Sequence, residues 1–197
     1  MPGRWRGHAH AGTGPSPRAS AGSANTVASR YLSRAARGSG RICTRNGSRA
    51  TVLLDTDVLV YRHDPRDRAK QNAALKLFRS LAEAERAATS AQCLAEFYRV
   101  VTRRLPEPIS PRDALAEVAR YAEIVTVLDV TAVAVLEACR GSAEHGLSVW
   151  DALVWACAKL EQIPFLLTED GEHGRAIEGV TYLDPFDRRF DLEGLLA

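Results

Sequence analysis

From Thr51 onward, short runs of aliphatic and β-branched residues alternate with longer stretches of helical periodicity, and this alternation constrains the fold more than any other feature. The runs predicted as strands are residues 52–54, 87–89, 124–128, 163–167 and 180–183. The stretches predicted as helices are residues 66–86, 91–104, 111–123, 131–142 and 149–160. Strands that alternate with helices form a mostly parallel sheet that is covered on both faces. We therefore predict a three-layer α/β/α domain.

Residues at the ends of the predicted helices support these boundaries. Ser90 and Ser148 stand where N-caps are expected, and Pro111 suits the first turn of a helix. Pro106 is expected to stop the helix that precedes it, and Gly146 marks a break between two helical stretches.

The charge divides the chain at the same point as the periodicity. Residues 1–50 contain nine Arg, no Lys and no acidic residue, whereas residues 51–197 carry 17 basic and 24 acidic side chains, a net charge of −7. The first segment is rich in Gly, Ser and Arg and has little apolar surface to bury, so we expect it to be disordered. Residues 51–197 form the predicted domain.

Three interpretations of residues 1–50 are open. The Arg charges suit an arm that binds nucleic acid, and an Arg-rich, Ser-rich segment without acids is typical of a targeting peptide. The third interpretation is an artefact of the reading frame or a dispensable extension, which the Ala and Arg content of a GC-rich coding sequence favours. We assign no function to this segment.

Two further features limit the class of protein. No run of 18 or more apolar residues is present, so we expect no membrane span and a cytoplasmic protein. The four cysteines, Cys43, Cys93, Cys139 and Cys157, have neither CxxC spacing nor zinc-like His partners. The last three lie in apolar helical stretches, which favours small core residues.

Four carboxylates stand at the polar edges of apolar runs: Asp55, Glu96, Asp151 and Asp170. Acids near a core lose hydration and repel each other, so they persist mainly when they are paired or bind a cation. Asp55 and Asp170 each follow a predicted strand, and binding sites in parallel sheets lie at the carboxyl ends of the strands. Asp151 lies in an otherwise apolar helix, and Glu96 lies on a helix face beside apolar neighbours. Together they predict a metal-dependent site.

Each acid also has a purely structural interpretation. Asp55 can cap a following helix, and Glu96 can be an exposed helix residue. Asp151 can complete a capping box, and Asp170 can be a turn residue. The case for a site therefore depends on all four acids reaching one edge of the sheet.

Five segments resemble motifs of the PIN-domain ribonucleases, including the VapC-type toxins. They are residues 54–61 (LDTDVLVY), 95–100 (AEFYRV), 147–154 (LSVWDALV), 167–170 (LTED) and 179–186 (GVTYLDPF). The resemblance covers residues 51–186 in the family's order and says nothing of residues 1–50. It implies a PIN-like fold for residues 51–197.

The resemblance also implies the site residues. The acids that would hold Mg²⁺ or Mn²⁺ are Asp55, Glu96, Asp151 and Asp170. Thr168 would orient a carboxylate or water beside them. The family usually has Asn where this chain has Asp57, which either adds negative charge beside the site or caps the following helix.

The ligand type indicates the chemistry. Carboxylates and water suit a hard cation, and the His and Cys groupings of a zinc site are missing from the sequence. A GxSxG motif and a Walker A loop are also missing, so no covalent nucleophile is indicated. We expect a metal-dependent endoribonuclease that hydrolyses RNA phosphodiester bonds. The resemblance implies a homodimeric toxin that is inhibited by a cognate antitoxin protein.

Two other classes of protein stay open. A degenerate PIN domain would bind RNA or protein without catalysis, and another phosphohydrolase would use the same acids on DNA or small phosphates. The presence of all four acids favours the nuclease. Arginines near the motifs that can contact phosphates are Arg62, Arg99, Arg103, Arg104 and Arg175. Three histidines are predicted as turn residues: His63, His145 and His173.

Overall fold

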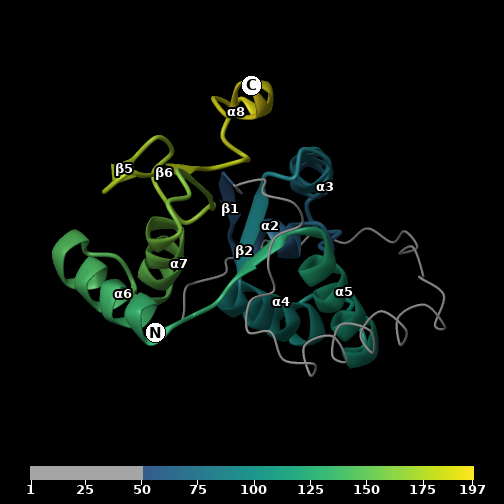
Figure 1. The fold of residues 1–197 in the computed structure, drawn as a ribbon. Coiled ribbons are helices and arrows are strands. Elements are labelled where there is room, and N and C mark those ends of the chain that lie inside the picture. Colours follow the sequence, from purple (N-terminus) through teal and green to yellow (C-terminus); the bar gives the residue numbers. More distant parts are fainter. Residues whose placement is uncertain (1–50) are drawn as a thin grey trace.

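Six short strands form one sheet in the computed structural model, which describes residues 51–197 (Figure 1). The strands are β1 (Val52–Leu54), β2 (Ala87–Ser90), β3 (Thr126–Leu128), β4 (Phe165–Leu167), β5 (Ala176–Ile177) and β6 (Val180–Leu183). Their order across the sheet is β3-β2-β1-β4-β6-β5, and every neighbouring pair is parallel except β5 and β6. The prediction of disorder for residues 1–50 lies outside the described residues.

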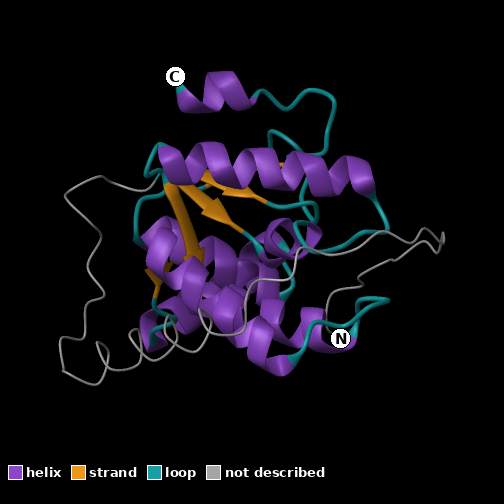
Figure 2. Cartoon of the chain, turned by 90° about the vertical axis from the view of Figure 1, so that its right-hand side faces the viewer, coloured by secondary structure: helices purple, strands orange, loops and turns teal. Residues whose placement is uncertain are grey.

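Seven helices connect and cover these strands within residues 51–197. They are α2 (Thr56–Tyr61), α3 (Arg68–Glu83), α4 (Ala91–Arg103), α5 (Pro111–Ile124), α6 (Ala132–His145), α7 (Val149–Leu160) and α8 (Leu192–Leu196). Figure 1 shows α6 and α7 on one side of the strands and α3, α4 and α5 on the other, and Figure 2 shows the strands enclosed by helices. The predicted α/β architecture is confirmed.

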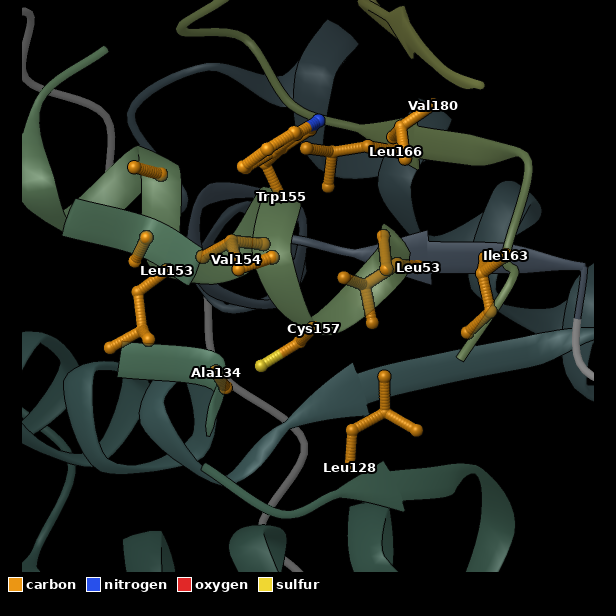
Figure 3. Packing of buried hydrophobic residues seen from close by; sticks show 14 of the residues in the cluster. Leu53, Leu128, Ala134, Leu153, Val154, Trp155, Cys157, Ile163, Leu166 and Val180 are labelled. Carbon is orange, nitrogen blue, oxygen red and sulfur yellow. The ribbon is translucent and has the colours of Figure 1, made fainter. Parts of the chain in front are cut away.

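Side chains of the central strand alternate between two hydrophobic cores. Leu53 belongs to the core on the side of α7, where Figure 3 shows it with Trp155 and Leu166. Its neighbours Val52 and Leu54 belong to the other core, with apolar side chains of α3, α4 and α5. Because successive strand residues face opposite sides, a strand that is buried on both faces is apolar throughout.

The strand order places a topological switch between β1 and β4. From β1 the chain proceeds outward through β2 and β3, and then returns to add β4 and β6 on the other side of β1. In parallel sheets the crevice at such a switch point, outside the carboxyl ends of the strands, is the usual ligand site.

The N-caps predicted from the sequence are confirmed. The Ser90 hydroxyl accepts a hydrogen bond from the Cys93 amide, and the Ser148 hydroxyl accepts one from the Asp151 amide. Gly146 ends α6 in the left-handed conformation, with φ of 70°. The starts of α4 and α7 could therefore be predicted from side chains that accept hydrogen bonds from the free amides of the first helical turn.

Some predicted boundaries are wrong. Ile124 belongs to α5 and not to the following strand, because the helical ladder continues to the Val125 amide, which bonds to the Tyr121 carbonyl. Ile163 precedes β4, and α6 continues to His145 instead of ending at residue 142. Strand β5 and helix α8 were not predicted, since segments of two and five residues are too short to show a period.

The structure also tests the predictions for membrane spans and for the cysteines. Within residues 51–197 no helix is both long enough and apolar enough to cross a membrane. Cys93 and Cys157 are buried as expected, but Cys139 is exposed on α6. Cys43 lies outside the described residues.

Candidate active site

A small pocket opens where β1 and β4 end. The residues that line it are Asp55, Asp151, Val154, Leu166, Thr168, Asp170 and Tyr182. The Asp55 amide donates to the Leu167 carbonyl at 3.0 Å, which continues the β1–β4 pairing by one residue and puts Asp55 next to the end of β4. Three of the four predicted acids and Thr168 therefore meet at the switch point of the sheet.

Three donors hold the Asp55 carboxylate. The Thr56 amide donates to Oδ1 at 2.6 Å, and the Thr168 hydroxyl donates to Oδ2 at 2.8 Å. The buried Cys93 thiol lies 3.6 Å from Oδ1 as a further, weaker donor. Asp55 thus caps α2, as its structural interpretation proposed, and at the same time faces the pocket.

Asp151 and Asp170 reach the pocket from two other segments. Asp151 lies in the first turn of α7, where the Ser148 hydroxyl donates to its Oδ2 at 2.7 Å. The Asp170 amide donates to the Thr168 hydroxyl at 3.1 Å. Thr168 consequently bonds to both Asp55 and the loop that carries Asp170, and it fixes these two segments relative to each other.

Glu96 does not line the pocket. It projects from α4 beside it, and the Thr56 hydroxyl donates to its Oε2 at 3.0 Å. Because Thr56 also donates its amide to Asp55, one residue connects the fourth acid to the pocket.

Asp57 has a structural task in this protein. Its Oδ1 accepts from the Val58 amide and its Oδ2 from the Glu169 amide, both at 2.6 Å. The carboxylate therefore fastens the loop after β4 to the first turn of α2. Burial raises the pKa of Asp57, and the charge of Asp55 raises it further.

The pocket is electrostatically unbalanced. Burial, followed by the charges of Asp151 and Glu96, raises the pKa of Asp55 to about 6 despite its hydrogen bonds. Burial and the charge of Asp151 also raise the pKa of Asp170. The residues of the described chain that line the pocket include no cationic side chain. Carboxylates held together without a counter-charge fit a divalent cation.

The donor set fits a hard cation that keeps part of its water shell. All charged groups in the pocket are carboxylates, the ligands that Mg²⁺ and Mn²⁺ prefer. Between residues 51 and 197, the one group of three side chains whose ligand atoms all lie within 4.8 Å is elsewhere, at Glu144, His145 and Glu178. The pocket acids are therefore more widely spaced, and an ion held by them would keep part of its water shell.

The arginines named from the sequence differ in their surroundings. The Arg62 guanidinium lies 3.8 Å from the centre of the Phe78 ring, and two of its nitrogens are buried, so it is less accessible to a phosphate than the exposed arginines. Arg99, Arg103 and Arg104 are exposed at α4. Arg175 is exposed and donates to the His145 carbonyl.

Two of the three predictions for histidines hold. His63 lies in a turn, with Nε2 3.0 Å from the Tyr121 hydroxyl, and His173 lies in a turn and accepts from the Asp184 amide. His145 is instead the last residue of α6 and pairs with Glu178. None of the three lines the pocket within the described part of the chain.

Sequence reasoning missed the side chains that support the acids. Thr56 and Cys93 contact Asp55, and Tyr182 lines the pocket from β6. Thr56 and Tyr182 fall inside the quoted motifs, which was the available signal. Which residues from other strands and helices lie beside Thr56 and Tyr182 depends on the strand order, which the sequence motifs do not give.

Comparisons with known proteins agree with this fold. The family model "PIN domain" matches residues 52–178. A toxin–antitoxin complex from Klebsiella pneumoniae shares 15% identity over 69% of this chain and 98% of the matched chain, with a TM-score of 0.52. DNA-bound VapBC from Salmonella typhimurium shares 17% identity over the same fractions, also with a TM-score of 0.52.

None of the curated proteins matches the chain. At 15–17% identity, the two structures establish similarity of fold only. The family model matches well over half of the sequence and spans every segment that lines the pocket except β6, which carries Tyr182. The chain therefore belongs to the PIN domain family.

Proposed function

We propose that this protein is a divalent-metal-dependent endoribonuclease that acts as the toxin of a toxin–antitoxin pair. The observation that carries the proposal is the meeting of Asp55, Asp151 and Asp170 with Thr168 in one pocket at the switch point of the sheet. Membership of the PIN domain family supports a nuclease, and the acidic lining supports the dependence on metal.

The four acids and Thr168 have different roles in the proposed reaction. Asp55, Asp151 and Asp170 would hold Mg²⁺ or Mn²⁺. The Glu96 carboxylate, which accepts a hydrogen bond from the Thr56 hydroxyl, would add negative charge beside them. A bound cation of this kind lowers the pKa of water and stabilises charge on a phosphate. Thr168 keeps the Asp55 carboxylate in position through its 2.8 Å hydrogen bond.

The acidic pocket needs cationic groups nearby to hold RNA. Arg99, Arg103 and Arg104 are exposed on or just after α4, the helix that carries Glu96. We assign the phosphates on either side of the cleaved bond to these arginines.

A toxin of this kind would be inhibited by a protein partner, the antitoxin. The two solved structures of similar fold are described as a toxin–antitoxin complex and as VapBC. Helices α3 and α4 are the proposed antitoxin surface, and each exposes a large apolar side chain, Leu75 on α3 and Tyr98 on α4. We also propose that the protein is a cytoplasmic homodimer.

Replacement of Asp151 by Asn tests the nuclease. We expect RNA cleavage by D151N in Mg²⁺ to fall by at least about 100-fold, because the variant removes one charged ligand. The matched control is E137Q, the same chemical change outside the pocket, which should cleave within about twofold of the parent. A folded D151N variant that cleaves RNA as fast as the parent would contradict the proposal.

Growth measurements test the toxin role separately. Expression of the parent chain should arrest growth, expression of D151N should not, and co-expression of the product of a neighbouring open reading frame should relieve the arrest. Cleavage of RNA in vitro without growth arrest would leave the nuclease and remove the toxin assignment.

A further inference from the structure

The Tyr182 hydroxyl is a buried polar group without a partner. Tyr182 is only 4% exposed, yet its hydroxyl has no hydrogen-bond partner in the described residues. A buried hydroxyl that gives up water without finding another partner costs free energy, so native proteins rarely retain one without a reason. Tyr182 also lines the acidic pocket, which suggests that its partner is what the pocket binds.

The surroundings of the ring fix its position. Tyr182 lies in β6, which pairs with β4, and its ring packs on Gly171, where an added Cβ would lie 2.6 Å from Cδ1. The charges of Asp151 and Asp55 act on the phenol and, after burial, raise its pKa. The phenol therefore stays neutral, and it lines the same pocket as the two carboxylates.

A hydrated cation would supply the missing partner. The pocket acids do not bring three ligand oxygens within 4.8 Å of one another, so an ion held among them would keep part of its water shell. Water bound to a divalent cation is a strong hydrogen-bond donor, and carboxylates and a neutral phenol oxygen are suitable acceptors.

We propose that Tyr182 is a positioning residue of the cation site, and that its hydroxyl oxygen accepts a hydrogen bond from a water molecule of the bound ion. The inference rests on the proposed metal-dependent function. It assigns a residue outside the four acids to the site and explains why the hydroxyl has no hydrogen-bond partner among residues 51–197.

Two tyrosine-to-phenylalanine variants form a matched test. Tyr121 is also buried, but its hydroxyl lies 3.0 Å from His63 Nε2 and 3.5 Å from the Leu59 carbonyl. Y182F and Y121F thus remove the same atom. The Tyr182 hydroxyl has no hydrogen-bond partner in the described part of the chain, whereas the Tyr121 hydroxyl has two.

Calorimetric titration of the metal-free, full-length protein with Mn²⁺ measures the effect without relying on activity. We expect the Kd of Y182F to be about 3- to 10-fold higher than that of the parent, and the Kd of Y121F to stay within about twofold. Thermal unfolding without metal should give Y182F a Tm equal to or above that of the parent, and Y121F a lower Tm.

The outcomes separate the two levels of the proposal. If the parent does not bind Mn²⁺, both the cation site and the role of Tyr182 are wrong. If the parent binds and Y182F binds equally well, only the role of Tyr182 is wrong. A metal-free Y182F protein whose Tm falls as far as that of Y121F would show that the hydroxyl has a partner within the protein, and would also overturn the inference.

Discussion

Two groups of acids in this protein have opposite electrostatic environments. The pocket group (Asp55, Asp151, Asp170) has no cationic side chain of residues 51–197 lining its pocket. The α6–α7 group joins Glu137, Glu144 and Glu178 to Arg140, His145 and Lys159. In the α6–α7 group, hydrogen bonds from Arg140 and Lys159 lower the pKa values of Glu137 and Glu178 to about 2, whereas that of Asp55 is raised to about 6.

The difference distinguishes the proposed metal site from an ion-pair network. The α6–α7 group has three ligand atoms close enough to hold an ion, but its acids already have cationic partners within the protein. The pocket acids are farther apart, and no cationic side chain of residues 51–197 lines the pocket. The proposal of a cation site in the pocket therefore rests on charge balance and not on the proximity of ligand atoms.

The largest expected contrast is stabilisation by metal. At a concentration about 100 times the Kd, Mg²⁺ should raise the Tm of the parent and of E137Q by about 5–10 °C, because the ion binds only the folded protein. D151N should lose most of this increase. An increase in Tm that E137Q loses and D151N keeps would reverse the assignment of the two groups.

Two glycines give a second contrast. A Cβ at Gly171 would meet the Tyr182 ring in the pocket, and a Cβ at Gly141 would meet the Trp155 ring beside the α6–α7 group. G171A and G141A should each lower the free energy of unfolding by about 1–3 kcal/mol. Only G171A should also weaken binding of Mn²⁺, as measured by calorimetry, because the ring it displaces lines the pocket. Equal binding by both variants would show that the pocket tolerates movement of Tyr182.

The smallest expected contrast is that D55N and E137Q change the free energy of unfolding in opposite directions. Without metal at pH 7.5, D55N should raise the free energy of unfolding by about 1 kcal/mol, because it removes a repelled, partly buried charge. E137Q should lower it by up to about 1 kcal/mol, since it breaks ion pairs at the surface. Urea denaturation measures both changes, and changes of the same sign would contradict the comparison.

The pH dependence sharpens this contrast. The pKa of folded Asp55 is raised above its ordinary value of 3.8 to about 6, so the penalty of its charge is present above pH 6 and disappears as the pH falls towards 3.8. The difference between D55N and the parent should therefore shrink from pH 7.5 to pH 5. For Glu137 the folded pKa is lowered from 4.5 to about 2, so its contribution is lost only below pH 4.5 and the effect of E137Q should stay constant in this range.

The effect of Asp55 on the free energy of unfolding is measured as the difference between D55N and the parent at each pH, because His63 also titrates. Burial lowers the pKa of His63 to about 4, so the folded protein resists its protonation and loses stability as the pH falls below 6.5. This trend opposes that of Asp55 in the parent. It cancels when D55N and the parent are compared at each pH.

Much of the fold could be predicted from the sequence because its signals are local. The N-caps Ser90 and Ser148 and the apolar run of β1 depend on neighbours within a few residues, and the structure confirms them. The end of α5 was misplaced because the β-branched residues after it suit a strand as well as the last helical turn. Exposure of Cys139 could not be predicted, since it depends on how α6 packs.

The sequence by itself determined the strand–helix alternation, the acids that follow the strands and the excess of acids in residues 51–197. Only the tertiary structure decided which acids share a pocket, because the pairing of β1 with β4 joins residues more than 100 positions apart. It also decided that Asp57 fastens a loop, that Glu96 is connected to the site through Thr56 and that the Tyr182 hydroxyl has no partner within the described residues. Hydrogen-bond partners and charge balance depend on contacts between segments that are distant in the chain, so local sequence patterns cannot predict them.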